Sequence, residues 1–150
     1  MVSRLIVFRG LPGSGKSTMA KDFQKSYICA GYTTALYESD MYFTDKDGNY
    51  KFDGSRLPHA HAWCRNKVLE ALGNCDIVIV ANTNLSLDEM SDWKLMADNL
   101  GTRMEVFHLK TQYGNVHGVP AETLERMKSR EVNYPGETLI ESAAIEQSDV

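Results

Sequence analysis

The hydrophobic positions of this chain form short apolar runs that alternate with longer segments of helical period. Residues 5–8 and 77–81 are nearly continuous runs of apolar side chains, many of them β-branched. This is the pattern of parallel strands that helices cover on both faces. Residues 33–37 and 104–109 predict two weaker strands. The predicted strands are therefore well separated along the chain, as parallel strands must be.

Helical periods fill the intervals between these strands. Apolar side chains recur at three- and four-residue spacing along residues 19–30, 57–72 and 90–100. Ser86 and Glu89 precede the third of these segments and form a capping-box pattern, in which each side chain satisfies the backbone N–H group of the other residue. The sequence therefore predicts three amphipathic helices, each lying between two strands.

A fourth helix is predicted after the last strand, from Pro120 to about residue 130, because the fixed φ angle of proline suits the first helical position. Strands that alternate with helices predict an α/β fold of three layers, with a mostly parallel sheet of about four strands. Beyond residue 134 the sequence is polar and predicts no element. We therefore expect one domain over residues 1–134, with the fourth helix as its lid, and a polar tail over residues 135–150.

The segment between the first strand and the first helix carries the most specific motif of the chain. Residues 10–17 match the P-loop pattern G-x-x-x-x-G-K-[ST], in the strand–helix context that this motif requires. Its glycines let backbone N–H groups surround an anion, and the start of the helix adds partial positive charge. Lys16 is expected to reach the β- and γ-phosphates of ATP or another nucleoside triphosphate, and the Ser17 hydroxyl is expected to ligate Mg²⁺. The expected nucleotide-binding residues of this P-loop NTPase or kinase fold are Gly10, Leu11, Pro12, Gly13, Ser14, Gly15, Lys16, Ser17 and Thr18.

Polar residues after the second and third strands are candidates for catalysis and acceptor binding, because ligands of open parallel sheets bind at the carboxyl ends of the strands. Asp40 is expected to act as a general base, to hold Mg²⁺, or to do both, and a turn or helix cap is the alternative. Tyr42 is expected either to stack on a base or ribose or to pack its loop on the sheet. Asn82 and Asn84 are expected to face the γ-phosphate or the acceptor.

Taken together, several motifs resemble the AAA-type P-loop domain of 5′-hydroxyl polynucleotide kinases over roughly residues 3–130. The resemblance implies transfer of the γ-phosphate of ATP to the 5′-hydroxyl of a nucleic acid end. In that family the residue that matches Asp40 is the general base, and the residues that match Lys16 and Ser17 hold ATP and Mg²⁺. The motifs that carry the resemblance are residues 10–18, 39–43, 48–53, 60–63, 82–84 and 117–120.

The chain departs from this family pattern where charged residues are usual. Ala81 stands where the family often has an acidic residue after the third strand, and Gly114 stands where the lid carries an arginine. A cation at that place neutralises the transferring phosphoryl group. We therefore expect the cation to come from Arg126 or Arg130, one helical turn apart, with Arg126 the closer to the lid loop. Lys110 is a further candidate.

Composition narrows the class of protein and its partners. The chain is 43% hydrophobic and 24% charged, which is typical of globular proteins, and it carries no apolar run of the about 20 residues that cross a membrane. Three widely spaced cysteines, at positions 29, 64 and 75, indicate reduced thiols and a cytoplasmic protein. The net charge of −4 argues against a large non-specific surface for nucleic acid, but a short strand can still bind in a local groove.

Three functions fit these observations. The first is an ATP-dependent kinase of the 5′-hydroxyl polynucleotide type, with a nucleic acid end as acceptor. The second is a kinase for a nucleotide or another small molecule, which the acidic composition favours because long polyanions need basic tracks. The third is a nucleotide-binding interaction module with little transfer activity, which Ala81 and Gly114 favour.

Overall fold

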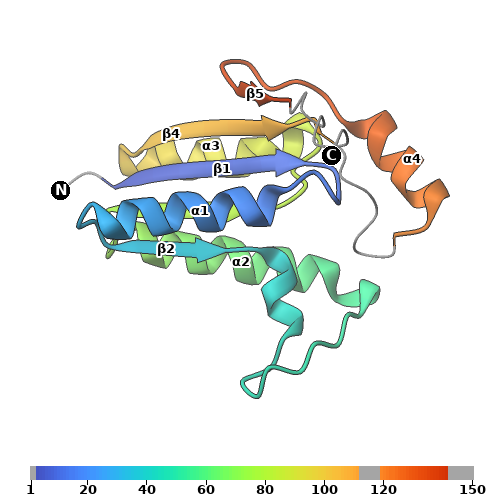
Figure 1. The fold of residues 1–150 in the computed structure, drawn as a ribbon, viewed down its shortest axis with the longest axis horizontal. Coiled ribbons are helices and arrows are strands. Elements are labelled where there is room, and N and C mark those ends of the chain that lie inside the picture. The colour runs from blue at the N-terminus through green and yellow to red at the C-terminus, as the bar shows by residue number, and fades with distance from the viewer. Residues whose placement is uncertain (1–2, 112–118, 142–150) are drawn as a thin grey trace, which may run out of the picture.

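The predicted strands become neighbours in one parallel sheet. The computed structural model describes residues 3–111 and 119–141 of the chain. The order of strands across the sheet is β2-β3-β1-β4-β5, and every neighbouring pair is parallel. Figure 1 shows β1, β2 and β4 pointing in the same direction. Because β1 is central, the phosphate loop that follows it lies in the middle of the carboxyl edge of the sheet. The strands are β1 (Arg4–Gly10), β2 (Thr34–Tyr37), β3 (Ile77–Ala81), β4 (Arg103–Leu109) and β5 (Thr138–Ile140).

The sheet has five strands, one more than the sequence predicts. The additional strand, β5, lies beyond residue 134 and pairs with the end of β4, where Leu109 is opposite Ile140. It is only three residues long, and Thr138 and Leu139 are both exposed. Such a short edge strand has no alternating pattern from which it could be predicted.

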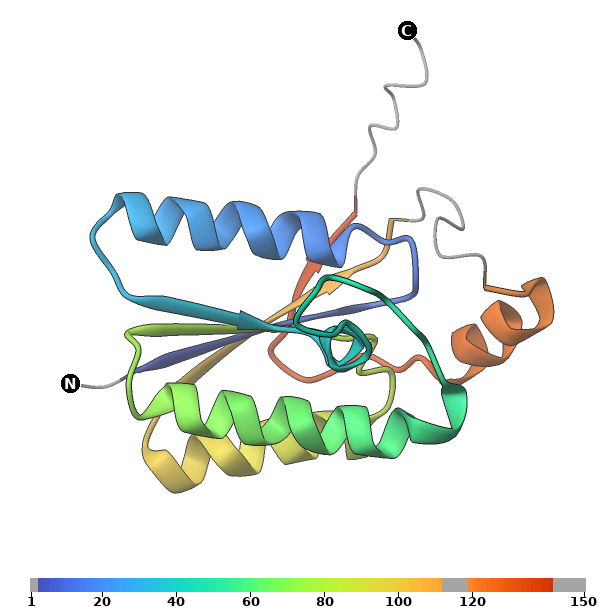
Figure 2. The ribbon, with the colours of Figure 1, turned by 90° about the horizontal axis from the view of Figure 1, so that it is seen from below.

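Helices cover both faces of the sheet, as the fold class requires. Helix α1 (Lys16–Cys29) lies on one face, and α2 (Leu57–Leu72) and α3 (Leu87–Leu100) lie on the other (Figure 2). Helix α4 (Ala121–Arg130) lies outside these layers, beyond the carboxyl ends of the strands (Figures 1 and 2). The predicted α/β fold of three layers is therefore confirmed.

The helix boundaries follow local signals. The Ser86 hydroxyl accepts a hydrogen bond from the backbone N–H of Glu89 (3.2 Å), and the Glu89 carboxylate accepts one from the backbone N–H of Ser86 (3.1 Å). The predicted capping box at the start of α3 is therefore confirmed. Pro120 directly precedes α4, one position before its predicted place in the first turn. Gly101 ends α3 in the left-handed conformation that favours glycine.

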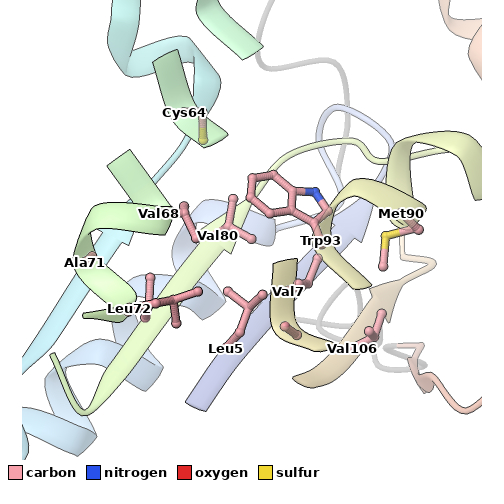
Figure 3. Packing of buried hydrophobic residues seen from close by; sticks show 12 residues of the cluster. Leu5, Val7, Cys64, Val68, Ala71, Leu72, Val80, Met90, Trp93 and Val106 are labelled. Carbon is pink, nitrogen blue, oxygen red and sulfur yellow. The ribbon is translucent and has the colours of Figure 1, made fainter. Parts of the chain in front are cut away.

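Two hydrophobic clusters hold the layers together. Alternate residues of β1 belong to different clusters: Leu5 and Val7 pack toward α2 and α3, while Ile6 and Phe8 pack toward α1. Figure 3 shows the first cluster, with the ring of Trp93 from α3 close to the central strands. Burial on both faces explains why the sequence of the central strands is continuously apolar rather than alternating.

Candidate active site

The phosphate loop joins β1 to α1 and needs glycine at two places. A Cβ atom at Gly10 would lie 2.6 Å from the carbonyl oxygen of Leu109 and 2.7 Å from Ser14 Oγ, so no other residue fits without displacing backbone. Gly15 has a φ angle of 93° and immediately precedes α1. The first N–H groups of α1 have no partner within the helix and carry its partial positive charge. They open onto a cleft of about 510 Å³, which is lined by residues 13–19, Asp22, Leu109, Thr111 and Ile140.

Lys16 occupies the place that an anion-binding lysine requires. Its Nζ donates a hydrogen bond to the carbonyl oxygen of Leu11 (3.1 Å), across the loop. Burial lowers the pKa of Lys16 to about 8, and the nearby carboxylate of Glu38 acts in the opposite direction. A half-buried ammonium group whose hydrogen bond goes to a carbonyl oxygen gains from any phosphate that enters the cleft.

The carboxylate that reaches the phosphate loop belongs to Glu38, which the sequence motifs do not single out. Ser17 Oγ donates a hydrogen bond to Glu38 Oε1. Alternation along β2 is the signal that could have identified this residue. Leu36 packs in the cluster on the α1 side and Tyr37 packs in the opposite cluster, so the next residue, Glu38, faces α1.

Asp40 lies apart from this contact. The chain leaves its extended path at Ser39 and enters a short 3₁₀ helix, η1 (Ser39–Phe43), so the strand alternation does not continue to Asp40. The Asp40 side chain is exposed, and its Oδ1 accepts a hydrogen bond from the Tyr50 hydroxyl (2.7 Å). Burial and the neighbouring Asp40 carboxylate raise the pKa of Tyr50 to about 12. Of the two expected ligands of Mg²⁺, Ser17 is therefore bonded to Glu38, and Asp40 is bonded to Tyr50.

The two asparagines after β3 both make structural hydrogen bonds. Asn82 Oδ1 accepts from the backbone N–H of Ser39 (2.8 Å) and so ties the end of β3 to η1. Asn84 has a φ angle of 43°, and its Oδ1 accepts from Trp93 Nε1 (3.0 Å). Both asparagines also line a small cavity of about 100 Å³ beside the carboxyl ends of β2 and β3. The other residues that line this cavity are Ser39, His61, Arg65, Thr83, Glu89, Asp92 and Trp93.

Tyr42 is held by neighbouring side chains. Its ring meets Phe43 and Trp63 edge-on, with centroid distances of 5.4 and 6.2 Å. Its hydroxyl accepts a hydrogen bond from Arg56 (2.7 Å). In this arrangement the ring packs the loop onto α2, whereas the sequence-based alternative to stacking is packing on the sheet.

The two arginines of α4 have different partners. Arg126 donates to the Thr123 hydroxyl (3.1 Å) within its own helix. Arg130 forms an ion pair with Glu89 (3.1 Å), a residue that lines the small cavity. Lys110 lies 3.7 Å from the carboxylate of Glu131. The lid positions Gly114, Asn115 and His117 lie outside the described residues.

A buried ionic network supports the loop after β3, and the sequence motifs do not indicate it. Arg9 is fully buried in β1, directly before the phosphate loop. Its guanidinium donates to the carbonyl oxygens of Asn84 and Leu85 (2.8 Å each) and to the carboxylate of Glu137 (2.7 Å). The ring of His108 joins the same carboxylate at 3.0 Å. The network therefore links the central strand to the cavity wall and to the segment before β5.

The phosphate loop in this sheet and helix arrangement defines a P-loop protein of kinase-like fold. A family model described as "Chromatin associated protein KTI12" matches residues 4–143, so the chain belongs to the KTI12 family. This finding corrects the narrower resemblance to the 5′-hydroxyl polynucleotide kinases, which holds for the shared kinase-like fold and not specifically for that family.

Similar proteins agree with this class. The chain is 29% identical to human NEDD4-binding protein 2 in an alignment of 151 positions, which covers 94% of this chain but only 8% of that protein. Kti12 of Chaetomium thermophilum, solved in complex with ADP-AlF3, is 19% identical with a TM-score of 0.69, covering 93% of this chain and 89% of the other. The Mycobacterium tuberculosis APS kinase CysC, solved with AMPPNP and APS, is 13% identical with a TM-score of 0.63, covering 99% and 96%. These two structures show that the fold is shared.

Two observations bear on location and metals. Among residues 3–111 and 119–141, no helix is both long and apolar enough to cross a membrane. Within the same residues, no group of three or more His, Cys, Asp or Glu side chains is placed to hold a metal ion by itself. The cytoplasmic location stays a prediction, since the family carries the description chromatin associated.

Proposed function

We propose that this chain binds ATP, or another nucleoside triphosphate, with Mg²⁺ and transfers the γ-phosphoryl group to a hydroxyl. The observation that carries the proposal is the phosphate loop at the mouth of the 510 Å³ cleft, with the half-buried Lys16 as one of the residues that line it. Backbone N–H groups at the start of α1 would hold the phosphates, and Lys16 would bind their β- and γ-oxygens. Phosphoryl transfer depends mainly on positioning and charge neutralisation, so such a cleft supplies much of what it needs.

The oxygen atoms at the phosphate loop belong to the hydroxyl of Ser17 and the carboxylate of Glu38. They suit Mg²⁺, which prefers oxygen ligands. Ser17 is the residue that would hold it, as the motif predicts. When bound, the ion neutralises phosphate charge. The other positions around the ion would be filled by phosphate oxygens and water, because Mg²⁺ in kinases is commonly held through one or two protein groups together with the substrate.

Asp40 would serve as the general base for the accepting hydroxyl. Its carboxylate already accepts a hydrogen bond from a hydroxyl, that of Tyr50, in an exposed position beside the cavity wall at Ser39. An acceptor would replace the Tyr50 hydroxyl at Asp40, donate its proton to the carboxylate and attack the γ-phosphorus. The bond from the γ-phosphorus to the β-phosphate oxygen would break, and the nucleoside diphosphate would leave. As a general base, Asp40 would therefore accept a hydrogen bond from the acceptor hydroxyl, as it now accepts one from the Tyr50 hydroxyl.

The leading acceptor is the 5′-hydroxyl of a nucleic acid end, which the motif resemblance supports. A small-molecule hydroxyl is the second candidate. The cavity next to Asn82 has a volume of only about 100 Å³, enough for a small group and not for a stacked base with its sugar. A panel of acceptors separates the two, because only a polynucleotide kinase requires the 5′-terminal hydroxyl of a strand.

Replacing Lys16 by alanine is expected to weaken ATP binding tenfold or more, because charge-assisted hydrogen bonds contribute about 1.5–3 kcal/mol each. Calorimetric titration of ATP into the wild type and the variant measures the change. Lys25→Ala is the matched control, since Lys25 is exposed on the same helix. Equal ATP affinity of K16A and the wild type would show that the phosphate loop does not bind the nucleotide as proposed.

ATP affinity is also expected to decrease as the pH rises from about 7 to about 9.5, since Lys16 binds phosphate only as the ammonium ion. The pKa of Lys16 is lowered to about 8 in the free protein, and bound phosphates would raise it again. Binding in this range should therefore take up a proton. Titrations in two buffers that differ in ionisation enthalpy measure the uptake. Its absence in the wild type, or its persistence in K16A, would assign the pH dependence to another group.

A further inference from the structure

Strand β3, one of the two neighbours of β1, carries no carboxylate at its end. In P-loop NTPases the ion is held by the Ser or Thr of the loop and by an aspartate of the Walker-B strand. Here β1 lies between β3 and β4, and β3 consists of apolar residues from Ile77 to Ala81. Asn82 follows, but its amide is already bonded to the backbone of Ser39 and to the thiol of Cys64. The usual source of the second ligand is therefore absent from β3.

The register of β2 and β3 places the carboxylate of Glu38 beside Ala81, where β3 ends without an acidic residue. Strand β2 pairs in parallel with β3, and the last pair joins Tyr37 to Val80. Glu38, the residue that follows β2, therefore lies beside Ala81. Both residues face α1, since Ala81 belongs to the cluster on that side and Glu38 bonds to Ser17. Adjacent strands are about 4.8 Å apart, and a glutamate side chain extends one methylene further than an aspartate.

The contact between Glu38 and Ser17 leaves the hydroxyl oxygen suited to a cation. A serine hydroxyl has one proton and two lone pairs, and Ser17 gives its proton to Glu38. Both lone pairs of Ser17 Oγ are then available to an ion at the mouth of the cleft. The carboxylate of Glu38 adds negative charge at the same place, which raises the pKa of the nearby Lys16 against the effect of burial.

We propose that Glu38, at the end of β2, supplies the protein carboxylate of the Mg²⁺ site in place of the missing group at Ala81. Glu38 fixes the orientation of the Ser17 hydroxyl and holds the ion through an intervening water molecule. This inference rests on the proposed nucleotide function of the phosphate loop. It assigns the metal role to Glu38 and leaves to Asp40 only the role of base.

The test is the dependence of ATP affinity on Mg²⁺. Calorimetric titrations of ATP in excess Mg²⁺ and in excess chelator give, for each variant, the factor by which the ion strengthens binding. In Glu38→Gln this factor is expected to fall about tenfold or more, the usual cost of removing a group that orients a metal ligand. Affinity without Mg²⁺ should stay the same or rise, because the amide keeps the size of the side chain and removes a negative charge from the phosphate site. Glu70→Gln, on the exposed side of α2, is the matched control.

A second variant moves the carboxylate back to β3. In the double variant Glu38→Gln with Ala81→Asp, the Mg²⁺ dependence of ATP binding is expected to recover, because the two positions are neighbours in register. Thermal unfolding of each variant without nucleotide shows whether it is folded. An unchanged factor in folded E38Q would overturn the role of Glu38 while ATP binding by the wild type leaves the proposed function standing. A wild type that binds no ATP in either condition would overturn both.

Discussion

Replacing Arg130 by alanine is expected to slow phosphoryl transfer about a thousandfold while ATP affinity changes little. The transition state of phosphoryl transfer spreads negative charge over the equatorial oxygens of the γ-phosphoryl group, and a cation placed there contributes at least this factor to the rate. Lys16 approaches from the phosphate loop, so a second cation must come from another wall of the cleft. Gly114 stands at the lid position where the resemblance to polynucleotide kinases implies an arginine.

The contacts of α4 favour Arg130 over Arg126. Sequence favours Arg126, which is closer to the lid loop, but in the structure this side chain is bonded within its own helix. Arg130 instead reaches Glu89 at the rim of the small cavity. Both partners of this ion pair are substantially exposed, at 58% and 39% of the side-chain surface, so the pair is weak and can exchange for a phosphate.

Single-turnover rates of R130A and R126A, measured with ATP saturating, separate the two arginines. R126A is the matched control, one turn away on the same helix, and its rate is expected to stay near that of the wild type. Arg130→Lys should not recover the full rate, because lysine lacks the planar fork that binds two phosphate oxygens. If both alanine variants turn over as fast as the wild type, α4 supplies no such cation and Lys110 becomes the next candidate.

Replacing Asp40 by asparagine is expected to lower the rate of transfer about a hundredfold or more, the usual contribution of a positioned general base. ATP affinity should remain close to that of the wild type, because the phosphate loop is bonded to Glu38 and not to Asp40. The structure of η1 should also persist, since the amide can still accept the hydrogen bond of Tyr50. Single-turnover rates and ATP titrations on the same preparation measure both quantities.

Tyr50→Phe is the companion variant for Asp40. It removes the hydroxyl that occupies Asp40 Oδ1 and leaves the carboxylate in place. Transfer in Y50F is therefore expected to be at least as fast as in the wild type. Unchanged turnover in D40N would exclude Asp40 as the base. Joint loss of ATP binding and of the folded state in D40N would instead make Asp40 a structural cap of η1.

Local patterns were sufficient for most of the fold. The apolar period over residues 57–72 predicts α2 with the bounds that the structure has, and the Ser86–Glu89 capping box places the start of α3. Both signals lie within one element and need no knowledge of its neighbours. Strand β5 differs, because its three residues form a strand only by pairing with the end of β4. No local sequence pattern predicts the pairing of β5 with β4.

The candidate site was also predicted only where the signal lies within one segment of the chain. The phosphate loop is a contiguous motif with a required context, so its residues could be named from sequence. Glu38 belongs to no motif, and its contact with Ser17 depends on the alternation of β2 and on where η1 begins. The Arg9 network requires the register in which Arg9 is opposite His108 and the approach of Glu137 from a distant segment. Such contacts follow from sheet order, which the sequence alone does not specify.

Transfer of the γ-phosphate of ATP to an acceptor is the most direct test of the proposed kinase activity. The protein is incubated with γ-labelled ATP and Mg²⁺, together with an oligonucleotide that carries a 5′-hydroxyl, the same oligonucleotide with a 5′-phosphate, and a set of nucleosides and other small alcohols. Label is expected on the 5′-hydroxyl oligonucleotide, with none on its 5′-phosphorylated form and none with K16A. Label on a small alcohol alone would replace the acceptor and keep the kinase. Tight ATP binding with no labelled acceptor and no dependence on Asp40 would contradict the claim that this P-loop protein is a kinase.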